Sequence, residues 1–434
     1  MLFRQFIDKQ LRYNFYFYRR LRAIQAQENK TDKDLLELQN HKFLTLLKRA
    51  YQFSPFYRNL YDRYGVNIAQ IQSVKDIDCL PQISKTDVRD HMDQIFIGRK
   101  FDRISAYTSG TTGNPTQVYR DYASIIEEGA YQWAYRMNLG HEPGMRTVVL
   151  RGNLHRNRKE RFNRFTNTLA LSSYHLNIKN AQWYYQKISD FKPNAILAYP
   201  SSVESLANLF TLLDRSLSIP FIFTSSETLY GHQRRKIEGV FNTKIADWYG
   251  NAERTIALRQ REDHLYEEIP TYSVNRFYED YVLSTSLINS SFPLINYRVD
   301  DTIQVHPQSL AKKRGKRLIS RIQGRSDDIL VLPDGTRIGL LWGAFDRIPH
   351  LLLAQIVQND ITNFKVNIVV SKKFSLEDER FLEEKLKEFV GHQALFTIHK
   401  VEEKDIIKSK AGKYKLVVNQ FLKNENAPNQ VLEV

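Results

Sequence analysis

The stretch from Tyr107 to Thr116, with the sequence YTSGTTGNPT, combines residue types that can bind an anion. Its glycines permit tight turns, and its Ser and Thr hydroxyls add hydrogen-bond donors to the backbone N–H groups. A loop of this kind could surround phosphate groups. It differs from the nucleotide-binding loop that ends in Gly-Lys-Ser/Thr, because Asn114 follows the second glycine. An ordinary turn has the same composition, so the loop alone does not establish a nucleotide site.

The sequence of this loop strongly resembles the phosphate-binding loop of the adenylate-forming superfamily, specifically its phenylacetate–CoA ligase branch. The resemblance implies that polar groups of the loop contact the phosphates of ATP. The residues concerned are Thr108, Ser109, Gly110, Thr111, Thr112 and Gly113. Many members have lysine where Asn114 stands, and the commoner ligases have a second lysine where Thr116 stands, a position at which the phenylacetate branch tolerates threonine. The missing lysine at position 114 bears on catalytic speed rather than on family membership.

Three later segments resemble family motifs that bind adenosine and the metal ion. TSSETL contains Glu227 and resembles the adenine-side segment. WYGNAE matches Tyr-Gly-x-x-Glu, which implies that Tyr249, followed by Gly250, stacks on adenine and that the catalytic Glu253 holds Mg²⁺. NYRVDD resembles Tyr-Arg-x-Gly-Asp, which implies that Asp301 accepts the ribose hydroxyls, with aspartate replacing the usual glycine at position 300.

The C-terminal part contains two more such segments. GRSDDILVLPDGTRIG resembles the family's hinge segment, which implies that Arg325 is a ribose or hinge-side contact, Asp327 the hinge, and Arg337 a phosphate or acceptor contact. KSKAGKYK resembles the C-terminal lysine segment, with Lys413 as the catalytic lysine. Each segment alone has an ordinary explanation, such as a helix cap or an exposed lysine. Their order along nearly the whole chain favours the family.

The subgroup that this sequence resembles is the CapK-like relatives involved in capsular polysaccharide biosynthesis. The supporting segments are PFYR, SSETL, PLINYR and SKAGKYK. The resemblance implies ATP-dependent activation of a carboxylic acid as an acyl-adenylate, followed by transfer to coenzyme A or to a precursor of a surface polysaccharide. Two alternatives stay open. The chain could transfer AMP itself to a small molecule, or it could bind nucleotide or an acidic polymer without catalysis.

The expected ligands follow from this resemblance. They are ATP, Mg²⁺ and a small carboxylic acid, with coenzyme A, a nucleotide sugar or an amine as the acceptor. The aromatic residues Trp133, Tyr135, Tyr199 and Trp248 are candidates for the acid pocket, although aromatic side chains equally often form core.

Composition limits the other classes of function. The 63 lysines and arginines against 48 acidic residues give a net charge of +15 over 434 residues. The charge is spread along the chain without a run of five or six like residues, so we expect no specific nucleic-acid binding. The single cysteine, Cys79, excludes an intramolecular disulfide and any Cys-based metal cluster.

No apolar stretch reaches the ~20 residues that a membrane-spanning helix needs, and the N-terminus lacks a signal peptide's apolar region, so we expect a cytoplasmic protein. The segment LRYNFYFYRRLRAIQ mixes aromatic residues with arginines. It could lie on a membrane surface as a peripheral contact. Packing of its aromatic residues on the main domain is the favoured interpretation.

The pattern of apolar runs predicts two domains of α/β class. Residues 1–325 form a large AMP-binding domain with parallel α/β layers and a helical lead-in over 1–65, and residues 326–434 form a small mobile α+β lid. Short apolar runs at 146–151, 195–199, 220–224 and 244–249 alternate with helical patterns, which is typical of a parallel sheet. In such sheets the ligand binds where the strands end, which would bring Ser201, Glu227 and Glu253 together.

Overall fold

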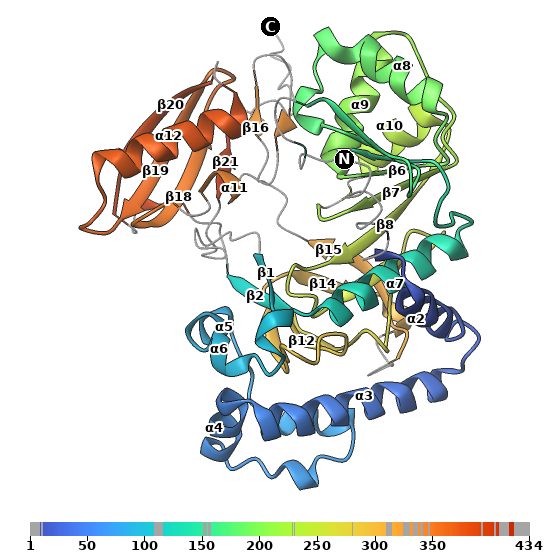
Figure 1. Ribbon diagram of the computed structural model, residues 1–434, viewed down its shortest axis with the longest axis vertical. Helices are drawn as coiled ribbons and strands as arrows, with labels where there is room; N and C mark the ends of the chain where they lie inside the picture. Colours follow the sequence, from blue (N-terminus) through green and yellow to red (C-terminus); the bar gives the residue numbers. More distant parts are fainter. Residues whose placement is uncertain are drawn as a thin grey trace, which may run out of the picture.

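The computed structural model describes residues 9, 12–107, 116–150, 154, 158–227, 229, 231–279, 281–309, 315–323, 330–332, 337–338, 342–345, 348–391, 394–402, 405–407 and 416–420. The described part opens with helices α2 (Phe15–Gln25), α3 (Asp32–Phe53) and α4 (Pro55–Arg63), and α3 and α4 lie at the bottom of Figure 1. Helix α3 begins at a reciprocal capping box that Thr31 and Asp34 form.

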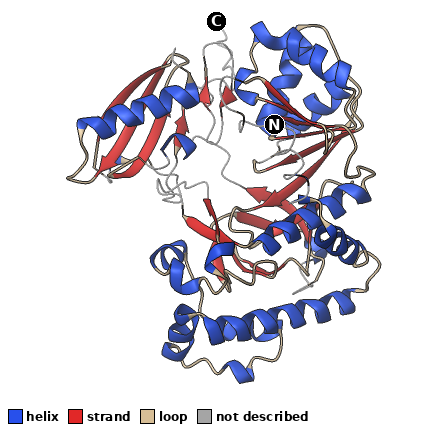
Figure 2. Cartoon of the chain, in the orientation of Figure 1, coloured by secondary structure: helices blue, strands red, loops and turns tan. Residues whose placement is uncertain are grey.

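The large domain then follows as short helices, a hairpin and an alternation of strands and helices (Figure 2). The elements before the central sheet are η1 (Ile68–Gln70), η2 (Val74–Cys79), α5 (Lys85–Asp90), α6 (Met92–Ile95), η3 (Lys100–Asp102), β1 (Ile104–Tyr107), β2 (Gln117–Arg120) and α7 (Tyr122–Asn138). The sheet and its covering helices comprise β3 (Thr147–Leu150), β4 (Glu160–Asn163), β5 (Thr168–Leu171), η4 (Ser173–His175), η5 (Ile178–Asn180), α8 (Ala181–Phe191), β6 (Ala195–Ala198), α9 (Pro200–Leu212), β7 (Phe221–Ser225), α10 (Gly231–Phe241) and β8 (Lys244–Gly250). Further strands are β9 (Ala257–Gln260), β10 (Tyr266–Glu268), β11 (Ser273–Phe277), β12 (Val282–Ser286), β13 (Tyr297–Val299), β14 (Thr302–Val305) and β15 (Leu318–Gln323), with η6 (Pro307–Ser309).

The central sheet has ten strands in the order β14-β15-β10-β9-β8-β7-β6-β3-β5-β4. The four predicted strands, β3, β6, β7 and β8, are neighbours and run parallel, which confirms the α/β class. The strands β9, β10, β15 and β14 extend the sheet beyond β8 in antiparallel pairs and were not predicted. Several of them are only three or four residues long and carry charged side chains, so their sequences lack a strand pattern.

Helices cover both faces of the parallel strands. Ile196, Ile222 and Ile245 point to one face, where they pack with apolar residues of α8, α9 and α10. On the other face, Trp248 packs with residues of α7 and α2. Alternate residues of each strand therefore serve two separate cores, as expected for a sheet buried on both sides.

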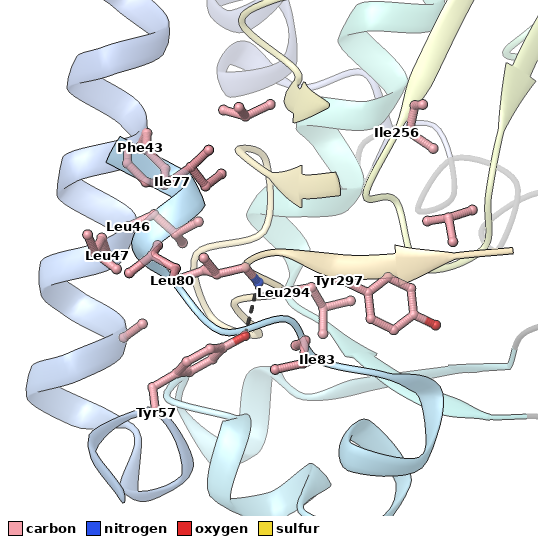
Figure 3. Close-up of a cluster of buried hydrophobic side chains, with 14 of the residues drawn as sticks. Phe43, Leu46, Leu47, Tyr57, Ile77, Leu80, Ile83, Ile256, Leu294 and Tyr297 are labelled. Atoms are coloured by element: carbon pink, nitrogen blue, oxygen red, sulfur yellow. Dashed lines mark hydrogen bonds between the residues drawn. The ribbon is translucent and has the colours of Figure 1, made fainter. Parts of the chain in front are cut away.

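A third core joins the lead-in helices to the three-stranded sheet β11-β12-β13 (Figure 3). Phe43 and Leu47 of α3 lie in this cluster with Leu294 and the buried Tyr297. The hydroxyl of Tyr57 accepts a hydrogen bond from the backbone N–H of Ile295 at 2.9 Å and donates one to the carbonyl of Pro293 at 3.0 Å. The helical lead-in is thus packed against the large domain.

The C-terminal domain has its own four-stranded sheet in the order β20-β19-β18-β21, with α12 packed on it. Its elements are β16 (Leu330–Val331), β17 (Arg337–Ile338), α11 (Trp342–Phe345), β18 (Leu351–Gln358), β19 (Asn363–Val370), α12 (Leu376–Val390), β20 (Leu395–Lys400) and β21 (Val417–Asn419). The predicted small α+β unit is therefore present. The boundary predicted at 325–326 lies outside the described residues and stays a prediction. No helix in the described ranges is long and apolar enough to cross a membrane.

Candidate functional site

Polar groups meet where the central parallel strands end, as the sequence predicted. The backbone N–H of Ser201, in the first turn of α9, donates to the Glu227 Oε2 at 3.0 Å. Ser225, at the end of β7, is paired in register with Trp248 of β8. Burial raises the pKa of Glu227, and the hydrogen bond from Ser201 opposes that shift. Ser201 and Glu227 therefore meet at the ends of β6 and β7, and β8 ends beside β7; that Glu253 joins them stays a prediction.

The residues expected to contact adenine and ribose are in direct contact with each other. The Tyr249 Oη donates a hydrogen bond to the Asp301 Oδ2 at 2.7 Å. Asp300 has different partners, because it accepts from the Arg298 Nε at 3.0 Å and lies 3.8 Å from the Lys85 Nζ. The carboxylate at position 301, rather than its neighbour, is thus the one that faces Tyr249.

Glu253 is held by a tyrosine that the sequence analysis did not single out. The Glu253 side chain is largely buried, and its Oε1 accepts a hydrogen bond from the Tyr297 Oη at 2.8 Å. Tyr297 itself is fully buried in the core of Figure 3. A well-packed donor of this kind fixes the orientation of the carboxylate. Tyr297 lies inside the segment NYRVDD, which was the available sequence signal for it.

Arg120 contacts the turn that carries Glu253. It lies on β2, whose other end, at Gln117, pairs with Tyr107 of β1 beside the predicted phosphate loop. The Arg120 guanidinium, at the end of β2, donates to the carbonyl of Ala252. Burial and the charge of Arg254 lower the pKa of Arg120 to about 10, so it stays cationic near neutral pH. This cation was also missed, because a lone arginine after a strand has no sequence signature.

A small pocket lies between α7 and the strands beside Trp248. Its lining comprises Gln132, Tyr135, Arg136, Leu197, Phe223, Thr224, Ser225, Ala246 and Trp248. Two of the aromatic residues proposed for the acid pocket, Tyr135 and Trp248, are thus among the lining residues. Trp133 instead stacks on the buried His141 with ring centroids 5.5 Å apart, and Tyr199 precedes α9 as its N-cap.

Gly250 accommodates the indole of Trp248, one of the pocket residues. A Cβ added at Gly250 would lie 3.3 Å from the Trp248 Nε1, which is closer than side chains normally pack. Glycine at position 250 therefore leaves room for the indole of Trp248 beside the end of β8.

A buried carboxylate lies one residue before Trp248. Asp247 accepts hydrogen bonds from the Thr224 Oγ1 at 2.5 Å and from the Tyr266 Oη at 2.6 Å. Burial raises the pKa of Asp247 to about 6, and these hydrogen bonds limit the shift. The contacts tie β8 to β7 and β10 behind the pocket.

Several predicted site residues lie outside the described part of the chain. They are Thr108, Ser109, Gly110, Thr111, Thr112, Gly113, Arg325, Asp327 and Lys413. Arg337 lies on β17, paired with Val331. Within the described residues, no three His, Cys, Asp or Glu side chains form a group that could hold a metal ion. The roles assigned to Arg337 and to the residues outside the described part of the chain stay predictions.

Comparisons with known proteins find similar sequences and folds. The CapK C-terminal domain family matches residues 330–420. Protein CapK of Staphylococcus aureus is 26% identical over 381 residues, which cover 83% of each chain. The phenylacetate-coenzyme A ligase of Escherichia coli (strain K12) is 26% identical over 341 residues, which cover 69% of this chain and 73% of the ligase.

Solved structures show the same fold. The 2-hydroxyisobutyryl-CoA ligase, solved with 2-HIB-AMP and CoA in the thioesterification state, aligns with a TM-score of 0.56 and 16% identity over 91% of both chains. Its postadenylation state with 2-HIB-AMP aligns with a TM-score of 0.53 and 16% identity over 91% of this chain and 90% of that one.

The fold and the ordered motifs define the class of the adenylate-forming ligases. Within that class the similarity to CapK and to its C-terminal domain supports the CapK-like branch, as the sequence predicted.

Proposed function

We propose that this chain uses ATP to activate a small carboxylic acid as an acyl-adenylate and then transfers the acyl group to coenzyme A. The observation that carries the proposal is the hydrogen bond between Tyr249 and Asp301, because it joins two motifs that are 52 residues apart in the sequence. The names of the similar ligases and the shared fold support the same reaction. Because the reaction uses ATP and coenzyme A, it would take place in the cytoplasm.

The nucleotide would bind across the ends of β8 and β13. The ring of Tyr249 would stack on adenine, and Asp301 would accept the ribose hydroxyls. Because the Tyr249 hydroxyl already donates to Asp301, ring and carboxylate are held together before ATP binds. Less ordering is then required on binding, which favours affinity.

Adenylation joins two anions, so the site must neutralise charge. The substrate carboxylate bonds to the α-phosphorus of ATP while the bond from that phosphorus to pyrophosphate breaks. Arg120 places a buried cation at the turn that carries Glu253, and Lys413 would add a second cation. Glu253, fixed by Tyr297, is the residue that would hold Mg²⁺. A single carboxylate suits this ion, because Mg²⁺ in nucleotide sites binds one or two carboxylates together with phosphates. When bound, Mg²⁺ supplies positive charge to the phosphates.

The acid would occupy the pocket between α7 and β8. Its lining is mixed, since Tyr135 and Trp248 are aromatic whereas Gln132 and Arg136 are polar. The Arg136 guanidinium carbon lies 5.1 Å from the ring centroid of Trp133 and 5.7 Å from that of Phe223. This lining favours a small acid that carries a polar or anionic group over a purely apolar one.

Acyl transfer would follow a movement of the C-terminal domain. The thiol sulfur of coenzyme A bonds to the acyl carbonyl carbon, AMP leaves, and the thiol proton passes to solvent. By family resemblance, Asp327 would be the hinge, and its rotation would withdraw Lys413 and admit the thiol. A precursor of a surface polysaccharide is the alternative acceptor, which the similarity to CapK supports.

Pyrophosphate release with a panel of carboxylic acids tests the proposal. We expect ATP- and Mg²⁺-dependent release with at least one acid, hydroxamate formation when hydroxylamine is added, and a thioester when coenzyme A is added. An AMP-tagged product would instead indicate adenylyl transfer. Absence of nucleotide binding in calorimetry would contradict the proposal, because every step depends on the ATP site.

A further inference from the structure

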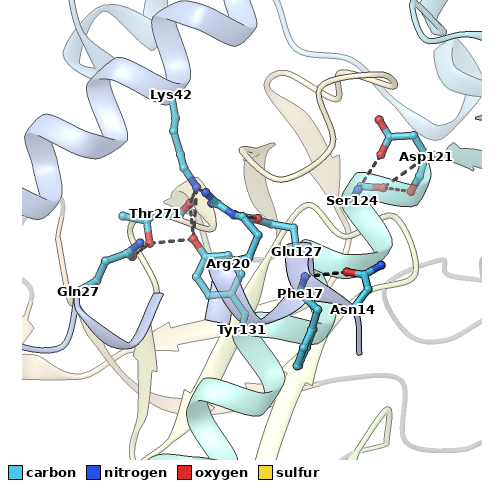
Figure 4. Close-up of polar contacts among 10 residues, drawn as sticks. All are labelled: Asn14, Phe17, Arg20, Gln27, Lys42, Asp121, Ser124, Glu127, Tyr131 and Thr271. Carbon is cyan, nitrogen blue, oxygen red and sulfur yellow. Dashed lines mark hydrogen bonds and ion pairs between the residues drawn. The ribbon is translucent and has the colours of Figure 1, made fainter. Parts of the chain in front are cut away.

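Helix α2 is fixed to the large domain along one face. Phe17, Leu21 and Ile24 are buried against the residues of α7. Arg20 forms a bidentate ion pair with Glu127 of α7, at 2.5 Å and 2.6 Å (Figure 4). The Asn14 side chain caps the helix by accepting from the backbone N–H of Phe17 at 2.9 Å. The favoured sequence interpretation, a helix packed on the main domain, therefore holds for this face.

The opposite face of α2 exposes aromatic side chains. Phe15 is 77% exposed, and Tyr16 and Tyr18 are 39% and 41% exposed. Arg19 and Arg22 are also exposed, as is Arg12 just before the helix. Positions 15, 18, 19 and 22 follow the i, i+3, i+4, i+7 spacing, so these aromatic and cationic groups share one side of the helix.

This face has a single sign of charge. Between Lys9 and Gln27 the sequence contains five Lys or Arg residues and no Asp or Glu. The acidic partner of Arg20, Glu127, lies on the buried side of the helix. An aromatic face flanked only by cations is complementary to a surface whose outer layer is anionic and whose inner layer is apolar.

We infer that the exposed face of α2 docks this protein on an anionic membrane surface. Phe15, Tyr16 and Tyr18 would enter the headgroup region, where aromatic rings are favoured, while Arg19 and Arg22 would contact lipid phosphates. A second copy of the chain fits this face less well, since like charges would meet. The phosphates of a nucleic acid would also be attracted to the arginines. The convex side of one helix, however, offers no groove along which a strand could run.

The inference does not depend on the proposed reaction. Helix α2 is separate in sequence from every segment assigned to ATP or to the acid. Failure of the adenylation assay would therefore leave the membrane inference standing, and the reverse also holds.

Sedimentation of the full chain with lipid vesicles tests the inference. We expect binding to vesicles of equal parts phosphatidylglycerol and phosphatidylcholine, much weaker binding to phosphatidylcholine alone, and weakening by salt. The double variant Phe15→Ser/Tyr18→Ser should weaken binding about tenfold or more, since it removes the side chains that would enter the membrane. Arg19→Gln/Arg22→Gln should weaken it by about fivefold per arginine.

Exposed residues near the C-terminal ends of α3 and α4 provide matched controls, because the C-terminal end of α3 and α4 lie away from α2 in Figure 1. Phe53 is 52% exposed and Tyr64 is 65% exposed, and Lys48 and Arg63 are exposed cations. Phe53→Ser/Tyr64→Ser and Lys48→Gln/Arg63→Gln should leave vesicle binding unchanged.

Three outcomes would overturn the inference. The first is equal binding to charged and uncharged vesicles, and the second is equal loss in the α2 and control variants. The third is absence of vesicle binding. This result overturns the inference even if the α2 variants change the oligomeric state or the binding of a single-stranded oligonucleotide. Circular dichroism of each variant checks that the fold is kept.

Discussion

The Tyr249 Oη donates a hydrogen bond to the Asp301 Oδ2 across 2.7 Å. Tyr249 lies on β8 of the ten-stranded sheet, whereas Asp301 lies in the two-residue connection between β13 of the three-stranded sheet and β14 of the ten-stranded sheet. The bond therefore joins the end of β8 to the point where the chain passes from one sheet to the other. A ligand that contacts both residues would lie at this point.

Replacing Asp301 by alanine should weaken the binding of ATP and AMP to a similar extent. Both nucleotides carry the ribose that this carboxylate is proposed to hold. Loss of a charged acceptor costs about 1.5–3 kcal/mol, which corresponds to roughly ten- to hundredfold in affinity. Titration calorimetry with each nucleotide measures the effect. Tyr249→Phe, which keeps the ring and removes the hydroxyl that bonds to Asp301, should cost less.

Asp300→Ala is the matched control for that experiment. The change removes a neighbouring carboxylate whose partners are Arg298 and Lys85, so nucleotide affinity should be nearly unchanged. If Asp300→Ala weakened the nucleotide more than Asp301→Ala did, the register assigned to this motif would be wrong.

Glu253→Gln should lower acid-dependent pyrophosphate release by about 10²–10³, because it removes the charge proposed to hold Mg²⁺. Tyr297→Phe keeps that charge and removes the hydroxyl that bonds to Glu253, so a smaller decrease is expected. Added Mg²⁺ should restore part of the rate in Tyr297→Phe and little in Glu253→Gln. Equal responses of the two variants to Mg²⁺ would contradict the assignment of Glu253 as the metal ligand.

The parallel core was predictable because each of its strands is a short apolar run followed by a polar turn and a helical pattern. Ile196, Ile222 and Ile245 lie in such runs, and the structure places all of them in one core. The antiparallel strands were not predictable in the same way. β10, with the sequence YEE, is stabilised by its neighbours in the sheet rather than by a pattern of its own.

The residues of the candidate site also differ in whether the sequence could predict them. Glu253, Tyr249 and Asp301 belong to linear motifs, so a resemblance could find them. Tyr297 and Arg120 act through contacts with residues far away in the sequence, and each alone looks like an ordinary core or surface residue. Contacts through space of this kind become visible only in the fold.

Stability should depend on pH through Asp247. Its pKa is raised from 3.8 to about 6, so between these values the folded protein binds more protons than the unfolded chain does. The stabilisation is complete below pH ~4 and is lost as the pH rises through about 6, by about 3 kcal/mol. Thermal unfolding of the wild type and Asp247→Asn across this range measures the effect. The stability advantage of the wild type over the variant should shrink as the pH rises.

Asp263→Asn serves as the control, because the Asp263 side chain is 45% exposed and lies in a turn. Its stability should follow the wild type at every pH. A constant difference between the wild type and Asp247→Asn would show that Asp247 stays ionised in the folded protein throughout.

Lys413→Ala should abolish adenylate formation and leave nucleotide affinity nearly intact. The proposed contact of this lysine forms mainly as charge builds on the α-phosphate, so its loss should lower turnover rather than binding, by about 10²–10³. Lys408, Lys410 and Lys415 carry the same charge nearby in the sequence and serve as internal controls. Acid-dependent pyrophosphate release is measured for all four alanine variants. If Lys410→Ala loses as much activity as Lys413→Ala, the segment contributes only general positive charge and the catalytic role of Lys413 is wrong.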